Sequence, residues 1–352
     1  MPHQTTSQPS MTATALVVGA TGGFGRAVAL RLLQQGWQVR ALTRHADMAQ
    51  RVGADADEAL RGLEAVQWHE GDAMNPQDVL AAAQGVQFIV HAANPPGYVR
   101  WRELALPMLA HSVEAARRTG ARLLLPGNVY NFGPDAGALV NEQSPQYPVT
   151  RKGAVRVEME EMLRRAAADP RQPVRSMVLR AGDFFDAHSP SSWFGTLLIK
   201  PGQPLRKVVY PGVASVGHAW AYLPDLAEAA ARLMALDLAE PDRLNQFEVL
   251  HFGGHWLPQG IEMAHAIQRA AGDPGLPIKS LPWPVVTLLS PFVPLFKEIR
   301  EMRYLWRVPL RLDNAKLVAL IGPEPHTPLD KAVHACLQDM GCLRAGLRPA
   351  QA

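Results

Sequence analysis

The chain has 352 residues, of which 47% are hydrophobic and 19% charged, and its formal net charge is +3. This composition is typical of a globular protein with a large core, and the length favours one large domain or two. The net charge is too small to indicate a nucleic-acid partner, and no run of like charges occurs. Two cysteines, Cys336 and Cys342, form neither a disulfide framework nor a zinc-binding pattern. We therefore expect reduced thiols, no metal site and a cytoplasmic protein.

Two segments bear on targeting and membranes. Residues 1–12 are polar and lack the apolar stretch of a secretory signal, so we expect a disordered tail there. The longest apolar stretch, residues 281–296, is short for a membrane span and contains four prolines, which break helix hydrogen bonds. We expect a buried or lid-like segment and no integral membrane span, with weak association with a membrane surface as the alternative.

Strand-like and helix-like stretches alternate through the first half of the chain. The apolar runs predict strands at residues 15–18, 37–43, 66–69, 88–92, 122–125 and 174–180. Helical periodicity predicts helices at residues 24–35, 76–84, 104–118 and 152–168, and Asn75 is the expected N-cap of the second. This order predicts an α/β fold with a Rossmann-type doubly wound parallel sheet over residues 13–182, which we interpret as a dinucleotide-binding domain.

After residue 182 the alternation stops, and a segment rich in Gly, Pro, Trp and Phe follows. A helix-like stretch at 224–236 and a strand-like stretch at 247–252 then resume the pattern. We therefore expect residues 208–252 to return to the first domain. Residues 183–207 and 253–352 would form a smaller, interleaved C-terminal lobe that binds the substrate.

The sequence Gly19-Ala-Thr-Gly22-Gly-Phe-Gly25 joins the first strand to the first helix. Three glycines in this context permit a tight turn, close approach to a pyrophosphate and close packing of the helix on the sheet. The helix N-terminus adds unpaired N–H groups and the positive end of the helix dipole. We expect cofactor contacts from Gly19, Thr21, Gly22, Gly23, Phe24 and Gly25.

Residues at three further strand ends refine this cofactor site. No carboxylate follows the second strand to bind a ribose 2′-hydroxyl, whereas Arg44 can pair with a 2′-phosphate. This favours NADP(H) over NAD(H). Asp72, after the third strand, is either an acceptor for the adenine amino group or an ordinary turn residue. Ala92 and Ala93, after the fourth, are small enough for a cofactor to lie against the sheet.

Several motifs occur in the order typical of one family. They are the Gly19–Gly25 spacing, Gly71-Asp72, Asn128-Val129-Tyr130, Leu179-Arg180-Ala-Gly182-Asp183, Tyr222-Leu-Pro-Asp225-Leu226-Ala227, Phe252-Gly253-Gly254 and Leu312-Asp313-Asn314-Ala-Lys316. In these features the chain resembles the extended branch of the short-chain dehydrogenase/reductase superfamily, the NAD-dependent epimerase/dehydratase type, over nearly all of residues 14–340.

The resemblance implies a catalytic Ser or Thr with a Tyr-x-x-x-Lys pair, in which the Lys lowers the pKa of the Tyr. Here the Ser position falls on Pro126 or Gly127, and Asn128 is the nearest polar side chain. Tyr147 is followed by Lys152 at the fifth position, not the fourth. Either Tyr147, Lys152 and Asn128 act with a local shift, or the usual acid/base pair is missing, and we favour the second interpretation.

The lobe after Arg180 is rich in aromatic side chains, which suits a mostly apolar pocket. The candidates are Asp183, Phe184, Phe185, Trp193, Phe194, His218, Trp220 and Tyr222. Arg206 and Lys207 are the only cations between Lys200 and Trp220, which argues against a nucleotide sugar. We interpret His218, His251 and His255 as structural residues, not metal ligands.

These features lead to two hypotheses. The first is an NAD(P)-dependent oxidoreductase or epimerase that acts on a moderately apolar carbonyl or hydroxyl compound, a small-molecule substrate, with Tyr147 or a substitute handling the proton. The alternative is a catalytically inert NADP(H)-binding sensor or scaffold protein of the atypical short-chain dehydrogenase/reductase type. A homodimer is an open alternative to a monomer.

Overall fold

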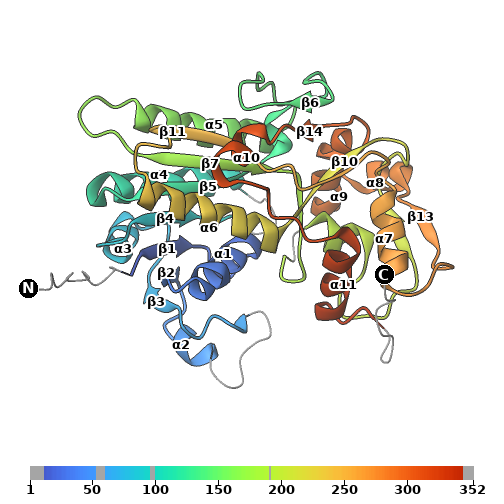
Figure 1. Ribbon diagram of the computed structural model, residues 1–352. Helices are drawn as coiled ribbons and strands as arrows, with labels where there is room; N and C mark the ends of the chain where they lie inside the picture. Colours follow the sequence, from blue (N-terminus) through green and yellow to red (C-terminus); the bar gives the residue numbers. More distant parts are fainter. Residues whose placement is uncertain (1–11, 53–59, 96–99, 190–191, 344–352) are drawn as a thin grey trace, which may run out of the picture.

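The computed structural model describes residues 12–52, 60–95, 100–189 and 192–343, so nearly all of the tail expected at residues 1–12 lies outside the described residues. A main sheet of seven strands has the order β11-β7-β5-β4-β1-β2-β3 (Figure 1). Its strands are β1 (Thr14–Val18), β2 (Gln38–Thr43), β3 (Gln67–Glu70), β4 (Phe88–His91), β5 (Arg122–Asn128), β7 (Ser176–Ala181) and β11 (Phe247–His251). Every neighbouring pair is parallel, which confirms the predicted Rossmann-type doubly wound sheet.

Helices cover both faces of this sheet because each buries one apolar stripe. One face packs against α1 (Gly23–Gln34), α6 (Leu223–Ala239) and α10 (Ala315–Ile321). The other packs against α3 (Pro76–Ala82), α4 (Trp101–Thr119) and α5 (Arg151–Ala167). The short α2 (Met48–Arg51) follows β2. Asn75 caps α3 as expected, with its Oδ1 accepting from the backbone N–H of Gln77 at 3.0 Å.

A second lobe lies at the carboxyl ends of the main-sheet strands, to the right in Figure 1. Its strands are β8 (Asp183–Phe185), β10 (His218–Tyr222) and β12 (His255–Leu257) in one sheet, β9 (Val208–Tyr210) with β13 (Ile278–Ser280), and β6 (Leu139–Val140) with β14 (Arg311–Leu312). Its helices include η4 (Phe194–Leu198), α7 (Glu262–Ala270), α8 (Trp283–Leu289), α9 (Pro294–Glu301), η5 (Arg303–Trp306) and α11 (Leu329–Asp339). Another short helix, η3 (Val129–Asn131), follows β5 and contributes Val129 and Tyr130 to the core of this lobe.

The two lobes exchange chain segments at positions that differ from the expected boundaries. The return to the first domain begins at Leu223 and not at residue 208, because β9 and β10 pair with strands of the second lobe. A later segment also returns, since α10 packs on α6 and β11 through the fully buried Leu317. Neither α10 nor the short strand pairs carry a strong periodic pattern that sequence could have assigned to one lobe.

The apolar stretch at residues 281–296 was expected to be buried or lid-like, and the prediction of burial is wrong because most of the stretch is exposed or half-buried. It forms α8, a turn and the first residues of α9, and only Val286 and Ser290 of α8 and its C-cap are buried. Leu288 is 73% exposed and Phe292 is 81% exposed. Among the helices that lie within the described ranges, none has both the length and the hydrophobicity required to cross a membrane.

A buried polar cluster ties the ends of β7 and β11 to α5. Arg180 donates from Nη2 to Glu160 Oε2 at 2.6 Å and from Nε to Oε1 at 2.9 Å, and its Nη1 lies 3.1 Å from Nε2 of His251. Asn131 adds a bond from Nδ2 to Glu160 Oε1 at 2.9 Å. Burial, reinforced by the Arg180 charge, lowers the pKa of His251 from its ordinary value of 6.5 to about 3.

A second buried histidine ends β4. The His91 ring places Nδ1 2.8 Å from Ser112 Oγ. Burial lowers the pKa of His91 from 6.5 to about 3, and the charge of Arg156 acts in the same direction. Both histidines are therefore neutral in the folded protein well below the pH at which they take up protons when unfolded.

We expect the free energy of unfolding to decrease as the pH falls from 6.5 toward 3, because the unfolded chain then binds protons at His91 and His251 that the folded chain does not. Between pH 7 and pH 5 each histidine should contribute a loss of about 2 kcal/mol. Denaturant unfolding at both pH values measures the loss. His91→Gln should reduce the pH dependence by about one such share, and an unchanged pH dependence in this variant would contradict the assignment.

Candidate cofactor and substrate site

The glycine turn between β1 and α1 brings three stretches of backbone into close contact. The N–H of Gly22 donates to the carbonyl of Gly19 at 3.0 Å, and Gly19 has a φ of 94°, which favours glycine. A Cβ at Gly19 would lie 2.7 Å from the backbone nitrogen of Ala93, and one at Gly25 would overlap the Gly19 carbonyl oxygen. Gly19 is therefore needed for the turn to reach β4, and Gly25 for α1 to begin close to β1.

The N-terminus of α1 fits a pyrophosphate. Among the described residues, no side chain caps this helix. Thr21 and Gly22 are exposed, so the first-turn N–H groups open onto solvent and not onto packed side chains. Phe24 is 5% exposed and packs in the core beneath the sheet, so only its backbone N–H is available to a ligand. Gly23 lies against the second lobe, because a Cβ there would lie 2.8 Å from Ser189 Oγ.

The strand-end residues have different surroundings. Arg44 is exposed directly after β2, and no partner is recorded for its side chain within the described ranges. Asp72 is a turn residue, since its Oδ1 accepts from the N–H of Met74 at 2.9 Å. Ala92 and Ala93 are half-buried beside Gly19. Ala92 and Ala93 thus line the glycine turn. Arg44, at the end of β2, has an exposed guanidinium that can bind a ligand.

The three expected catalytic residues do not share one environment. Tyr147 lies in the loop before α5 and is 66% exposed. Asn128 caps η3, with its Oδ1 accepting from the N–H of Tyr130 at 3.0 Å. Lys152 is buried, and its Nζ lies 2.6 Å from Oε2 of Glu298 in α9. Burial lowers the pKa of Lys152, and the bond and charge of Glu298 oppose this shift.

Sequence reasoning missed Arg156, one helical turn after Lys152. Its Nη1 donates to the carbonyl of Pro126 at 3.2 Å, and its guanidinium lies 5.0 Å from the ring centre of Trp101. Lys152 and Arg156 have the four-residue spacing that the resemblance implies for Tyr and Lys. The sequence does contain a signal for Arg156, since Lys152, Arg156 and Glu160 recur every four residues and therefore share one face of α5. Glu160 on this face pairs with Arg180 of the sheet, so the face is directed toward the sheet.

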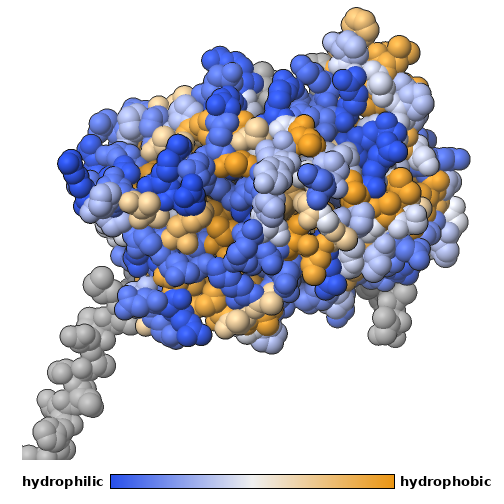
Figure 2. All heavy atoms as spheres, turned by 90° about the horizontal axis from the view of Figure 1, so that it is seen from above, coloured by the Kyte–Doolittle hydropathy of each residue, from blue (hydrophilic) through white to orange (hydrophobic). Residues whose placement is uncertain are grey.

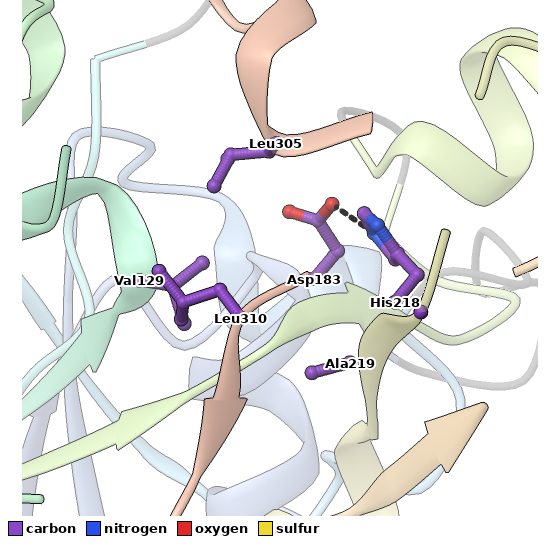
Figure 3. Close-up of a pocket in the computed structure, with 7 residues that line it drawn as sticks. Val129, Asp183, His218, Ala219, Leu305 and Leu310 are labelled. Atoms are coloured by element: carbon purple, nitrogen blue, oxygen red, sulfur yellow. Dashed lines mark hydrogen bonds and ion pairs between the residues drawn. The ribbon is translucent and has the colours of Figure 1, made fainter. Parts of the chain in front are cut away.

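A second polar cluster lies where the second lobe meets the carboxyl edge of the main sheet (Figure 3). Nε2 of His218 lies 2.8 Å from Oδ2 of Asp183, and the Tyr130 hydroxyl donates to Oδ1 at 3.4 Å. Trp193 donates from Nε1 to the Tyr130 hydroxyl at 3.1 Å. The His218 ring stacks on Trp306, with ring centres 4.0 Å apart and an interplanar angle of 14°. The imidazole is therefore held in one orientation.

These groups border a small cavity of about 10 Å³, close to the space that one water molecule needs. It is lined by Val129, Asp183, Gly217, His218, Ala219, Leu305 and Leu310 (Figure 3). Of the aromatic candidates, Phe185, Phe194 and Trp220 are fully buried in the core of the second lobe and do not line it. The described residues contain no group of His, Cys, Asp or Glu side chains that could hold a metal ion.

Comparisons with solved structures show the same fold. A UDP-glucose 4-epimerase from Bifidobacterium longum in complex with NAD+ and UDP matches with a TM-score of 0.68 and 16% identity, over 92% of this chain and 97% of that one. A UDP-glucose-4-epimerase from Stenotrophomonas maltophila with bound NAD and formylated UDP-arabinopyranose has a TM-score of 0.73 and 15% identity, over 94% and 98%. An L-threonine dehydrogenase from Clostridium difficile has a TM-score of 0.68 and 15% identity, over 94% and 98%.

Sequence comparison adds a local and a broad match. The local match is to a serine 3-dehydrogenase from Agrobacterium fabrum (strain C58 / ATCC 33970), 38% identical over 53 residues, 15% of this chain. The chain spans about a fifth of the length of that curated relative (21%). The broad match is to the family described as NAD dependent epimerase/dehydratase, over residues 15–245, and it includes the glycine turn, α5 and the Asp183–His218 pair. The chain therefore belongs to the NAD dependent epimerase/dehydratase family, whose members are NAD-dependent oxidoreductases and epimerases.

Proposed function

We propose that this protein is an NADP(H)-preferring oxidoreductase or epimerase of the cytoplasm that acts on a moderately apolar carbonyl or hydroxyl compound. The observation that carries the proposal is the buried Asp183–His218 pair beside a cavity at the carboxyl edge of the sheet. In parallel sheets, ligands bind outside the carboxyl ends of the strands. Asp183 comes two residues after β7, which lies three strands from β1, a separation of roughly 14 Å at ~4.8 Å per strand.

Different residues of the chain would bind different parts of the dinucleotide. The first-turn N–H groups at Gly22, Gly23 and Phe24 would bind the pyrophosphate, while Ala92 and Ala93 leave room beside the sheet. Arg44 would pair with the 2′-phosphate of NADP(H). A nicotinamide bound in this way supplies or accepts the hydride.

We propose that His218, and not Tyr147, donates and accepts the proton in the reaction. Imidazole is the side chain best suited to exchange protons near neutral pH. Asp183 orients the ring through Nε2 and Trp306 stacks on it, whereas Tyr147 is exposed in a loop. When a carbonyl accepts the hydride at carbon, His218 would give its proton to the oxygen and regain one from water. Asp183 would hold the ring through Nε2 during this transfer.

The substrate class follows from the walls of the cavity. Val129, Leu305 and Leu310 are apolar, and the Asp183 carboxylate would repel a phosphate. Arg206 and Lys207 are exposed and do not line the cavity. Although two structural neighbours were determined with UDP or a UDP sugar, we therefore propose a less charged substrate for this chain.

A second candidate function, a catalytically inert NADP(H)-binding sensor or scaffold, is favoured by the size of the cavity. A volume of about 10 Å³ admits a water but no carbonyl substrate unless residues that line the cavity move. The pairing of Lys152 with Glu298 also leaves the first turn of α5 occupied by an ion pair. The two candidates differ in whether NADPH is ever oxidised.

Arg44→Ala should weaken NADPH binding about tenfold or more and leave NADH binding nearly unchanged, because the lost bond is charge-assisted and reaches only the 2′-phosphate. Dissociation constants from titration of the nicotinamide fluorescence measure both. Arg51→Ala serves as the control, because it removes an exposed arginine seven residues later, at the end of α2. An equal loss for NADPH and NADH would refute the 2′-phosphate assignment.

His218→Gln and Asp183→Asn should each lower carbonyl-dependent NADPH oxidation by roughly 10²- to 10⁴-fold, the range of general acid–base catalysis, without changing the NADPH dissociation constant. Tyr147→Phe should leave the rate within about twofold, since its exposed hydroxyl has no role in the proposal. A large loss in Tyr147→Phe with little loss in the His218 and Asp183 variants would show that Tyr147, and not His218, donates the proton. Tight NADPH binding without oxidation by any member of a panel of aromatic and aliphatic ketones and aldehydes would favour the inert sensor.

A further inference from the structure

The hairpin formed by α8 and α9 carries a row of exposed apolar side chains. They are Val285 at 47%, Leu288 at 73%, Leu289 at 37%, Phe292 at 81% and Leu295 at 50% exposure. Hydrophobic side chains interrupt the hydrophilic surface on the side that carries the second lobe (Figure 2). Exposing such a row to water is unfavourable, whereas single exposed apolar residues are common on protein surfaces. The row therefore indicates a surface that binds a partner.

The charged side chains of α9 differ in exposure. Glu298 and Glu301 are only 18% and 14% exposed at their side chains and face α5, where they pair with Lys152 and Arg151. Lys297 and Arg300 are exposed. Lys297 and Arg300 thus present cations beside the start of α5, and Arg300 adjoins the hairpin because its Nη1 donates to Ser290 Oγ at 3.0 Å.

A groove adjoins this hairpin on its cationic side. It has a volume of about 290 Å³ and is lined by Val149, Thr150, Arg151, Lys297, Arg300 and Glu301. Val149 is 60% exposed and Tyr147, two residues earlier, is 66% exposed, so the loop before α5 adds exposed apolar side chains beside the groove. The docking face, defined as residues 147–151 and 285–300, therefore combines protruding apolar side chains with cations beside a groove.

We propose that the docking face binds the surface of an anionic lipid bilayer, with Leu288 and Phe292 inserted at the level of the headgroups. Apolar side chains that insert between lipids and cations that meet anionic headgroups are the two features that hold proteins on such surfaces. A second copy of the chain is a poorer occupant, because a two-fold contact here would bring Lys297 and Arg300 of both copies together. The proposal rests on the surface alone and is independent of the catalytic assignment.

The test uses the full-length protein and sedimentation with vesicles of phosphatidylcholine, with and without phosphatidylglycerol. We expect binding to the anionic vesicles, weaker binding to the neutral ones, and a decrease as salt screens the headgroups. Leu288→Ser combined with Phe292→Ser should lower the partition coefficient about tenfold or more. Lys297→Glu combined with Arg300→Glu should lower it by a similar factor on anionic vesicles alone.

Matched variants on the first lobe control for altered hydrophobicity and charge. Met74→Ser with Leu238→Ser removes two exposed apolar side chains, and Arg164→Glu with Arg165→Glu reverses two exposed cations. Both should bind as the unmodified protein does. Absence of binding to anionic vesicles at low salt, or equal losses in control and docking-face variants, would overturn the proposal. Light scattering that shows a dimer dissociated by the Leu288 and Phe292 substitutions would overturn it in favour of a second copy.

Discussion

The buried ion pair between Glu160 and Arg180 fixes the position of α5 on the main sheet. Arg180 donates two hydrogen bonds to Glu160 and approaches His251, while Asn131 donates to the same carboxylate. One cluster thereby joins α5, β7, β11 and η3. Removing one partner of a buried pair of this kind costs roughly 3–5 kcal/mol, because the other charge stays buried without compensation. The register of α5 on the sheet therefore depends on this contact.

That register decides which side chains reach the carboxyl edge. Arg156 and Lys152 lie one and two helical turns before Glu160 on the same face of α5. Arg156 then reaches the carbonyl of Pro126 at the end of β5, and Lys152 reaches Glu298 of α9. The sheet, the first turn of α5 and the second lobe are thus connected by charged side chains in a single row. A tyrosine hydroxyl reaches this edge from η3, where Tyr130 joins the Asp183–His218 pair.

The parts of the fold that local chemistry determines could be predicted from sequence. The main strands, Asn75 as a cap and the glycine turn follow from apolar runs, turn residues and the absence of a Cβ at Gly19 and Gly25. The roles of the candidate catalytic residues depend on tertiary packing and could not be predicted from sequence. The spacing from Tyr147 left a shifted Tyr147–Lys152 pair open and favoured a missing acid/base pair, but it could not identify the tertiary contact of Glu160 that sets the helix register.

The same limit explains the C-terminal half. Residues 281–296 were expected to be buried or lid-like. The prediction of burial failed because hydrophobicity indicates a preference for leaving water but does not identify the part of the protein that would cover the segment. The exposed Leu288 and Phe292 could be recognised only once the second lobe was assembled around other side chains. His218 was interpreted as structural, since no sequence pattern brings it to Asp183, 35 residues away.

The central claim is that a dinucleotide held at the glycine turn presents its reactive end to the Asp183–His218 pair. A crystal structure with NADPH bound tests this most directly. The account predicts the 2′-phosphate beside Arg44 and the nicotinamide ring beside His218, at the carboxyl ends of β5 and β7. A nicotinamide ring beside the exposed Tyr147 and away from His218 would contradict it.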